Sequence, residues 1–159
     1  MKTILAPIDF SPASKAVMAE AAELARAFHG RLVLLNVLQS TGIATGFVGM
    51  VGLPADFGSA EKTAQELLAE HERRLTDENL PVESAVSYGD PASSILDRAK
   101  TLAADFIVMG SHGHTALYEL LLGSTTHGVL LKANCPVVIV RADASAPTPA
   151  VTEEEHARV

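Results

Sequence analysis

The run Asp105-Phe106-Ile107-Val108-Met109 leads directly into Gly110-Ser111-His112-Gly113, and after nine more residues the chain continues with Gly123-Ser124. The first run has the character of a strand, and Ser124-Thr125-Thr126 favours the start of a helix that continues to about Lys132. Glycines let a backbone approach an anion closely, and the free N–H groups of a first helical turn point toward it. The spacing therefore predicts a phosphate-binding loop, without a Walker lysine and without the glycine spacing of a dinucleotide fold.

Strand and helix signals alternate over the rest of the chain. Apolar strand runs are expected at residues 3–8, 31–38, 82–88, 106–109 and 136–140, and helices are expected to begin near residues 12, 60, 91 and 124. This alternation predicts an α/β fold: an open, doubly wound parallel sheet of five strands with helices on both faces and right-handed crossovers. We expect one domain over residues 1–141 and a disordered tail over residues 142–159, which lack apolar bulk.

Turn chemistry marks the expected helix ends. Ser11-Pro12 and Asp90-Pro91 each place a capping side chain before a proline suited to the first helical position. Ser124 is expected to be the N-cap of the last helix, and Gly30 is expected to end the first helix in a left-handed conformation.

Composition restricts the class of partner. The formal net charge of −7 argues against a nucleic-acid binder and against electrostatic attachment to acidic membranes. No run reaches the roughly 18–20 apolar residues that cross a bilayer, and the first residues do not resemble a secretory signal. We therefore expect a cytoplasmic protein that binds no nucleic acid and does not insert into membranes.

The stretch 39–59 is expected to be a long flexible loop, because five glycines are interspersed with large apolar residues. Loops of this length are usually functional or disordered. Two interpretations stay open: a lid that closes over a ligand with the glycines as hinges, or an apolar surface for a partner or a second subunit.

Asp9 follows the first strand, just as the glycine loop follows the fourth. In open α/β sheets, ligands bind beyond the carboxyl ends of the strands where the strand order reverses. If these two strands are neighbours, Asp9 can bind ribose hydroxyls or an adenine edge while the glycine loop takes the phosphates. The alternative interpretation is that Asp9 only favours the dipole of the following helix.

His112, His114 and His127 could meet as a metal site, but no acidic residue or cysteine completes an obvious ligand set. The histidines are better explained as lining the phosphate region, where partial protonation would favour an anion. No metal ligands and no catalytic residues are therefore predicted.

Four segments carry a resemblance to a known family: residues 4–11 (Ile-Leu-Ala-Pro-Ile-Asp-Phe-Ser), residues 107–113, Leu120-Leu121-Leu122-Gly123-Ser124, and residues 135–141. In order and spacing the chain resembles the universal stress protein family, and in particular its ATP-binding branch, from residue 1 to about 141. The resemblance implies strand order 3-2-1-4-5, a fold of the adenine-nucleotide α-hydrolase type, and a homodimer formed through the last strand, Val137–Val140.

The resemblance also implies a set of residues around ATP. Pro7, Ile8 and Asp9 would contact adenine and ribose, and Val37 would line the base pocket. The ribose and phosphates would be held by residues of the glycine loop and the following helix: Met109, Gly110, Gly113, Gly123, Ser124 and Thr125.

The nine-residue spacer departs from the family pattern, because it carries Tyr118-Glu119 where a basic residue is common near the phosphates. A bound Mg²⁺ could supply the missing positive charge, and AMP or ADP are alternative ligands to ATP. The leading hypothesis is an adenine-nucleotide-binding stress-response protein that regulates an unknown partner through its loop or its dimer. The alternatives are a slow ATP hydrolase with Glu119 as the base, and a dimerising interaction module with a different ligand or none.

Overall fold

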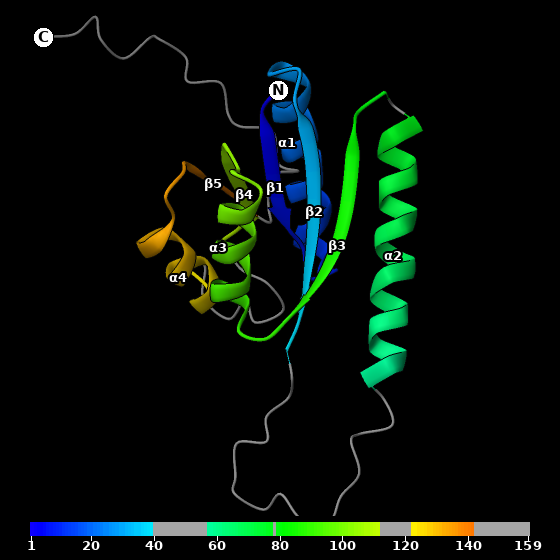
Figure 1. Ribbon diagram of the computed structural model, residues 1–159, viewed down its shortest axis with the longest axis vertical. Coiled ribbons are helices and arrows are strands. Elements are labelled where there is room, and N and C mark those ends of the chain that lie inside the picture. The colour runs from blue at the N-terminus through cyan, green and yellow to red at the C-terminus, as the bar shows by residue number, and fades with distance from the viewer. Residues whose placement is uncertain (40–56, 78, 112–121, 142–159) are drawn as a thin grey trace, which may run out of the picture.

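The computed structural model describes residues 1–39, 57–77, 79–111 and 122–141 (Figure 1). In chain order the elements are β1 (Thr3–Pro7), α1 (Pro12–Ala27), β2 (Arg31–Leu38), α2 (Phe57–Asp77), β3 (Val82–Tyr88), α3 (Pro91–Thr101), β4 (Phe106–Gly110), α4 (Ser124–Lys132) and β5 (Val137–Val140). The strands form one sheet in the order β3-β2-β1-β4-β5, and every pairing is parallel. The α/β class, the doubly wound sheet and its strand order are thus confirmed.

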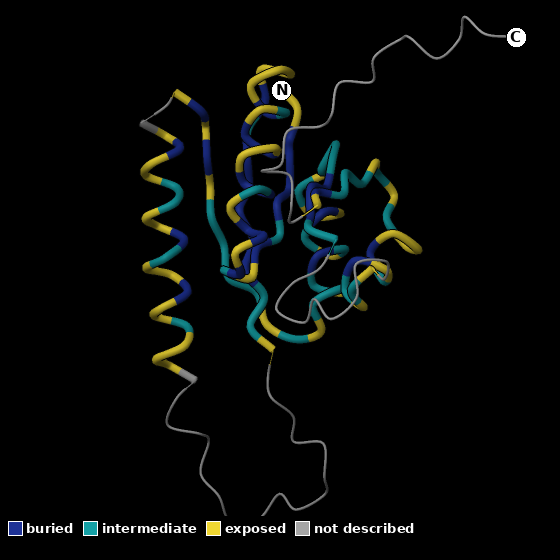
Figure 2. The backbone as a smooth tube through the Cα atoms, turned by 180° about the vertical axis from the view of Figure 1, so that it is seen from behind, coloured by how far each residue is buried: buried dark blue, intermediate teal, exposed yellow. Residues whose placement is uncertain are grey.

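Two apolar clusters cover the two faces of the sheet. Strand residues such as Ile4, Leu34 and Val108 pack with α1 and α2 on one face. Their sequence neighbours, among them Leu5, Leu35 and Ile107, pack with α3 and α4 on the other. Because successive strand residues point to opposite faces, only strands covered on both sides are apolar at nearly every position. Figure 2 shows the buried positions concentrated in the central strands.

Asp105 anchors the beginning of β1 to the beginning of β4. Its Oδ2 accepts the backbone N–H of Thr3 at 2.8 Å, and its Oδ1 accepts the Lys2 ammonium at 2.7 Å. Both contacts hold the pKa of the Asp105 carboxyl below its ordinary value, the Lys2 hydrogen bond having the larger effect. The two strands that flank the predicted site are therefore fixed in register at their far ends.

The end of α1 corrects the expectation for Gly30. The left-handed residue is His29, with φ of 50°. Gly30 follows it, and its N–H donates to the Ala25 carbonyl at 2.8 Å, while the His29 N–H donates to Arg26. These two bonds form the Schellman motif. Gly30 serves a different purpose: a Cβ there would lie 2.4 Å from the Lys2 carbonyl oxygen, so the residue is small because another backbone crosses it.

α3 ends with the same pair of bonds. The Ala104 N–H donates to Ala99, and the Ala103 N–H donates to Lys100. Here the left-handed residue is Ala103, with φ of 47°. A Cβ makes this conformation unfavourable, so no glycine marks this helix end in the sequence.

The second helix begins earlier than expected. α2 starts at Phe57, so the last three residues of the predicted 39–59 loop are helical. Residues 40–56 and the predicted disordered tail, 142–159, lie outside the described residues. Gly128 lies within α4, and a Cβ there would come within 3.0 Å of the Ala92 Cβ of α3. The glycine weakens α4 but lets the two helices approach closely.

Candidate functional site

A pocket of about 360 Å³ opens at the carboxyl ends of β1 and β4, where the strand order reverses. Nine of the ten predicted site residues line it: Pro7, Ile8, Asp9, Val37, Met109, Gly110, Gly123, Ser124 and Thr125. The tenth, Gly113, lies outside the described residues. The sheet therefore brings together residues that are up to 118 positions apart in the chain (Pro7 to Thr125).

The turn after β1 forms one wall of this pocket. The Ile8 N–H continues the ladder to β2 by donating to the Leu35 carbonyl at 2.8 Å. The Ile8 carbonyl instead accepts from the side-chain Nδ2 of Asn36, also at 2.8 Å. A buried side chain thus holds the last residue before Asp9.

The Asp9 carboxylate organises the start of α1. Its Oδ1 accepts the Ser11 N–H at 3.0 Å and the Ser14 hydroxyl at 2.9 Å. Ser11 occupies the N-cap position, as expected, but its own hydroxyl does not cap the helix. Asp9 binds the N-cap residue and the Ser14 hydroxyl instead, and it is still exposed at the pocket. Asp9 therefore has a structural role at the start of α1, and whether it also contacts a ligand stays a prediction.

Phe10 adopts an unusual backbone conformation next to Asp9, with φ of 60°. Left-handed non-glycine residues cost about 1–3 kcal/mol and cluster at functional sites. The Phe10 ring stacks on His71 of α2, with ring centroids 6.4 Å apart. Burial lowers the pKa of His71, and the nearby Arg74 lowers it further. The neutral imidazole is thus favoured beside the Phe10 ring.

The start of α4 forms the opposite wall and corrects the capping prediction. Gly123, not Ser124, is the N-cap, and Ser124 is the first helical residue. The Gly123 N–H donates to the Ser111 carbonyl at 2.9 Å, so this amide is already used within the protein. The Thr126 hydroxyl donates to the Gly110 carbonyl at 2.9 Å and ties α4 to the end of β4.

Three amide donors at this helix start have no partner among the described residues. The N–H groups of Ser124, Thr125 and Thr126 belong to the first turn, where no helical carbonyl lies four residues earlier. They line the pocket together with the Ser124 and Thr125 side chains. Among the described lining residues there is no lysine or arginine, so backbone dipoles supply the positive potential here.

Apolar side chains form much of the remaining pocket wall, beside the polar Ser11, Ser14 and Gln39. Ile8, Leu35 and Val37 come from the β1–β2 side, and Ile95 and Met109 come from α3 and β4. A pocket that is apolar at one end and rich in amides at the other suits a flat apolar ring joined to an anionic group.

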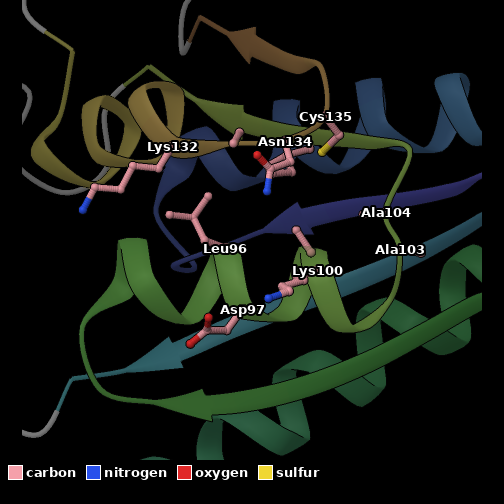
Figure 3. A pocket seen from close by; sticks show the side chains of 11 residues that line it. Leu96, Asp97, Lys100, Ala103, Ala104, Lys132, Asn134 and Cys135 are labelled. Carbon is pink, nitrogen blue, oxygen red and sulfur yellow. The ribbon is translucent and has the colours of Figure 1, made fainter.

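A second hollow, of about 430 Å³, lies at the other end of the sheet between α3 and the α4–β5 connection (Figure 3). Its lining combines Leu96 and Cys135 with the exposed side chains of Asp97, Lys100 and Lys132. None of the nine predicted site residues that the structure describes lines it. Burial raises the pKa of the Cys135 thiol, and the Asp105 charge raises it further, so the thiol form is favoured.

Only one of the three histidines of the possible metal site, His127, lies in the described part of the chain. His127 is exposed on α4, and His112 and His114 lie outside the described part of the chain. Within residues 1–39, 57–77, 79–111 and 122–141, no cluster of three histidine, cysteine or acidic side chains could hold a metal ion. Over the same ranges, no helix is long and apolar enough to span a membrane.

The profile of the universal stress protein family matches residues 1–141. The chain belongs to the universal stress protein family. It is 31% identical to universal stress protein YxiE of Bacillus subtilis, over 87% of this chain and 97% of that protein. It is 29% identical to universal stress protein MJ0577 of Methanocaldococcus jannaschii, over 88% and 94% of the two chains.

Solved structures of this family share the fold. Universal stress protein UspA from Lactobacillus plantarum superposes with a TM-score of 0.72 and 26% identity, over 88% of this chain and 97% of that one. A universal stress protein from Archaeoglobus fulgidus in complex with dAMP has a TM-score of 0.63 and 22% identity, over 87% and 97% of the two chains. At that identity the likeness shows the fold alone.

Sequence reasoning missed the residues that hold the pocket in shape. Asn36 interrupts an otherwise apolar strand, and this interruption was the available signal. Thr126 and Ser14 each follow a helix start by two or three residues, where a hydroxyl is common. Their partners, Gly110 and Asp9, are set by the fold.

Proposed function

We propose that this universal stress protein binds an adenine nucleotide in the pocket between β1 and β4 and acts by regulation rather than catalysis. The observation that carries the proposal is the convergence of nine of the residues implied by the family resemblance on one pocket, together with three helix-start amides that have no partner among the described residues. The apolar end would take the adenine, Asp9 the ribose, and the start of α4 the phosphates. Gly113 belongs to the same proposal as a phosphate contact.

The ligand class is supported by the family fold, in which the Archaeoglobus fulgidus protein is in complex with dAMP. Asp9 is the only carboxylate among the described lining residues. A Mg²⁺ ion would therefore be held mainly by phosphate oxygens and water, as is usual for this ion. We expect Mg²⁺ to change the affinity for ATP and to have little effect on AMP.

Ser124 allows a direct test of the amide contact. Proline is tolerated at the first helical position, so Ser124→Pro removes one N–H and the hydroxyl while the helix remains. Ser124→Ala removes only the hydroxyl. A hydrogen bond to a charged group contributes about 1.5–3 kcal/mol. We expect Ser124→Pro to bind AMP roughly 10-fold more weakly than Ser124→Ala does in calorimetry, with equal binding of adenosine.

Asp9→Ala tests the other wall, and Asp97→Ala is its matched control because it removes the same charge at an exposed position outside the pocket. We expect Asp9→Ala to weaken AMP and adenosine alike and Asp97→Ala to change neither. Equal binding by all four variants and the wild type would refute the site. Mass spectrometry of small molecules released from purified protein tests the alternative, an interaction module that holds a different ligand or none.

The proposed dimer would form along β5, an edge strand of apolar residues. The Pro136 and Val140 carbonyls face β4, accepting from Ile107 and Ser111. By alternation, the Val137 and Ile139 N–H groups face outward. Ile139→Pro would remove an outward donor and leave the β4 ladder intact. We expect it to be monomeric in sedimentation experiments at concentrations where the wild type is dimeric. A wild type that is monomeric throughout would exclude this interface.

A further inference from the structure

Asn36 is a polar residue in the interior of β2. Its side chain is 5% exposed, and Leu34, two positions earlier on the same face of the strand, is fully buried. Burying an amide without complete hydrogen bonding costs free energy that an apolar side chain would not. The position therefore needs an explanation other than packing.

The side-chain amide of Asn36 determines where β1 leaves the sheet. In a regular parallel ladder, the Ile8 carbonyl would accept from a backbone N–H of β2. Here it accepts from Asn36 Nδ2 at 2.8 Å, while the Ile8 N–H still donates to Leu35. The next two residues, Asp9 and the left-handed Phe10, turn away from the sheet into α1.

The other atom of the same amide is unsatisfied. Asn36 Oδ1 is buried and has no hydrogen-bond partner in the described part of the chain. A half-satisfied buried amide is a poor means of stabilising a core, because its unpaired oxygen has lost its water without gaining a partner. The bond to Ile8 is what this side chain contributes, and Ile8 directly precedes the residue proposed to bind ribose.

We propose that Asn36 is a positioning residue: by holding the Ile8 carbonyl, it orients the Asp9 carboxylate toward the nucleotide. This proposal rests on the proposed function of the same pocket. Asn36 does not touch the ligand, since it lies on the α1–α2 face of the sheet and does not line the pocket. It acts on Asp9, whose Oδ1 is in turn held by the Ser11 N–H.

The test combines Asn36→Leu with Asp9→Ala in a double-mutant cycle. We expect Asn36→Leu to bind AMP about 10-fold more weakly than the wild type, with a lower melting temperature because the Ile8 carbonyl loses its hydrogen-bond partner. In the Asp9→Ala background the same change should have no further effect. Leu34→Met is the matched control on the same face of the same strand, and it should leave AMP affinity unchanged. If Asn36→Leu folds poorly, Asn36→Val replaces it.

A second measurement separates this proposal from the nucleotide assignment. Hydrogen exchange at the Ser11 N–H, measured without ligand, reports directly whether the hydrogen bond from this N–H to the Asp9 carboxylate is formed. We expect faster exchange in Asn36→Leu and no change in Leu34→Met. If the wild type binds no adenine nucleotide, the function assignment fails and the exchange result alone decides the role of Asn36. Unchanged exchange overturns the proposal. An equal loss of AMP affinity with and without the Asp9 carboxylate also overturns it.

Discussion

Gly30→Ala tests whether the close approach of two backbone segments at the start of β1 and β2 requires a glycine. Gly30 joins α1 to β2, and a Cβ there would lie 2.4 Å from the Lys2 carbonyl oxygen and 3.2 Å from the Lys2 Cβ. That carbonyl also accepts the Arg31 N–H at 2.8 Å, which is the first rung between the two strands. Lys2 is further tied to Asp105. The added methyl group would therefore meet a backbone held by hydrogen bonds, and no flexible side chain could move aside to make room for it.

The magnitude follows from two losses and one gain. Forcing a methyl group into a packed site costs about 1–3 kcal/mol. Breaking the Arg31–Lys2 rung costs about 1 kcal/mol. Alanine restricts the unfolded chain and returns about 0.4–1 kcal/mol. We expect a net loss of about 1–3.6 kcal/mol, which at roughly 2–4 °C per kcal/mol lowers the melting temperature by about 2–14 °C.

Urea unfolding and thermal melts measure this effect, with Gly58→Ala as the control. Gly58 lies in α2, and a Cβ there would meet nothing within 4 Å. Helix propensity alone then predicts that Gly58→Ala stabilises by up to about 1 kcal/mol. Gly128→Ala should fall between the two variants, since its Cβ would approach Ala92 at 3.0 Å. A Gly30→Ala protein within about 0.5 kcal/mol of the wild type would refute the reasoning.

Three further predictions concern local interactions. Ala103→Gly should stabilise by about 0.5–1 kcal/mol in urea unfolding, because Ala103 has φ of 47°; a loss would contradict the helix-end assignment. Asp105→Asn should destabilise the protein at pH 7 by removing the contribution of the ionised carboxylate. In the wild type this contribution is fully present above the ordinary aspartate pKa and is lost as pH falls through the lowered pKa of the folded protein. If urea unfolding shows the same difference between mutant and wild type at pH 7 and at strongly acidic pH, the contact with Lys2 is not the cause. An NMR titration should give His71 a pKa below the ordinary histidine value, so that stability declines as pH falls from above the ordinary pKa through the pKa of the folded protein. Phe10→Ala should raise the pKa of His71 again by reducing its burial. A wild-type His71 with an unshifted pKa would exclude the stack with Phe10.

The sequence was sufficient for the sheet because its signals are local. An apolar run such as residues 31–38 and a cap such as Asp90-Pro91 depend only on neighbouring residues, and both elements start where they were expected. The Asp90 carboxylate does accept the Ser93 N–H, at 2.9 Å. The strand order came from the family resemblance, and the structure confirms it.

The errors occurred where one segment's conformation depends on another. A glycine after a helix suggests a left-handed cap, but Gly30 is required by the crossing of Lys2, a contact across 28 residues. α4 begins one residue earlier than the expected cap implied: Gly123 is the N-cap, and its N–H donates to the Ser111 carbonyl. Neither of these partners, Lys2 for Gly30 and Ser111 for Gly123, can be recognised from the local sequence pattern.

For the candidate site, the sequence alone predicted which residues could carry the chemistry: an acid after the first strand, glycines after the fourth, and hydroxyls at the start of the last helix. Only the tertiary structure decided which of their groups are available. In the fold, the Gly123 amide and the Thr126 hydroxyl are used in hydrogen bonds to other parts of the protein, and Asp9 is held by Ser11 and Ser14. Among the described residues, the amides of the first turn of α4 are left available to a ligand. The physical reason is that residue type sets what a group can donate or accept, whereas its partner is set by the packing of segments distant in the chain.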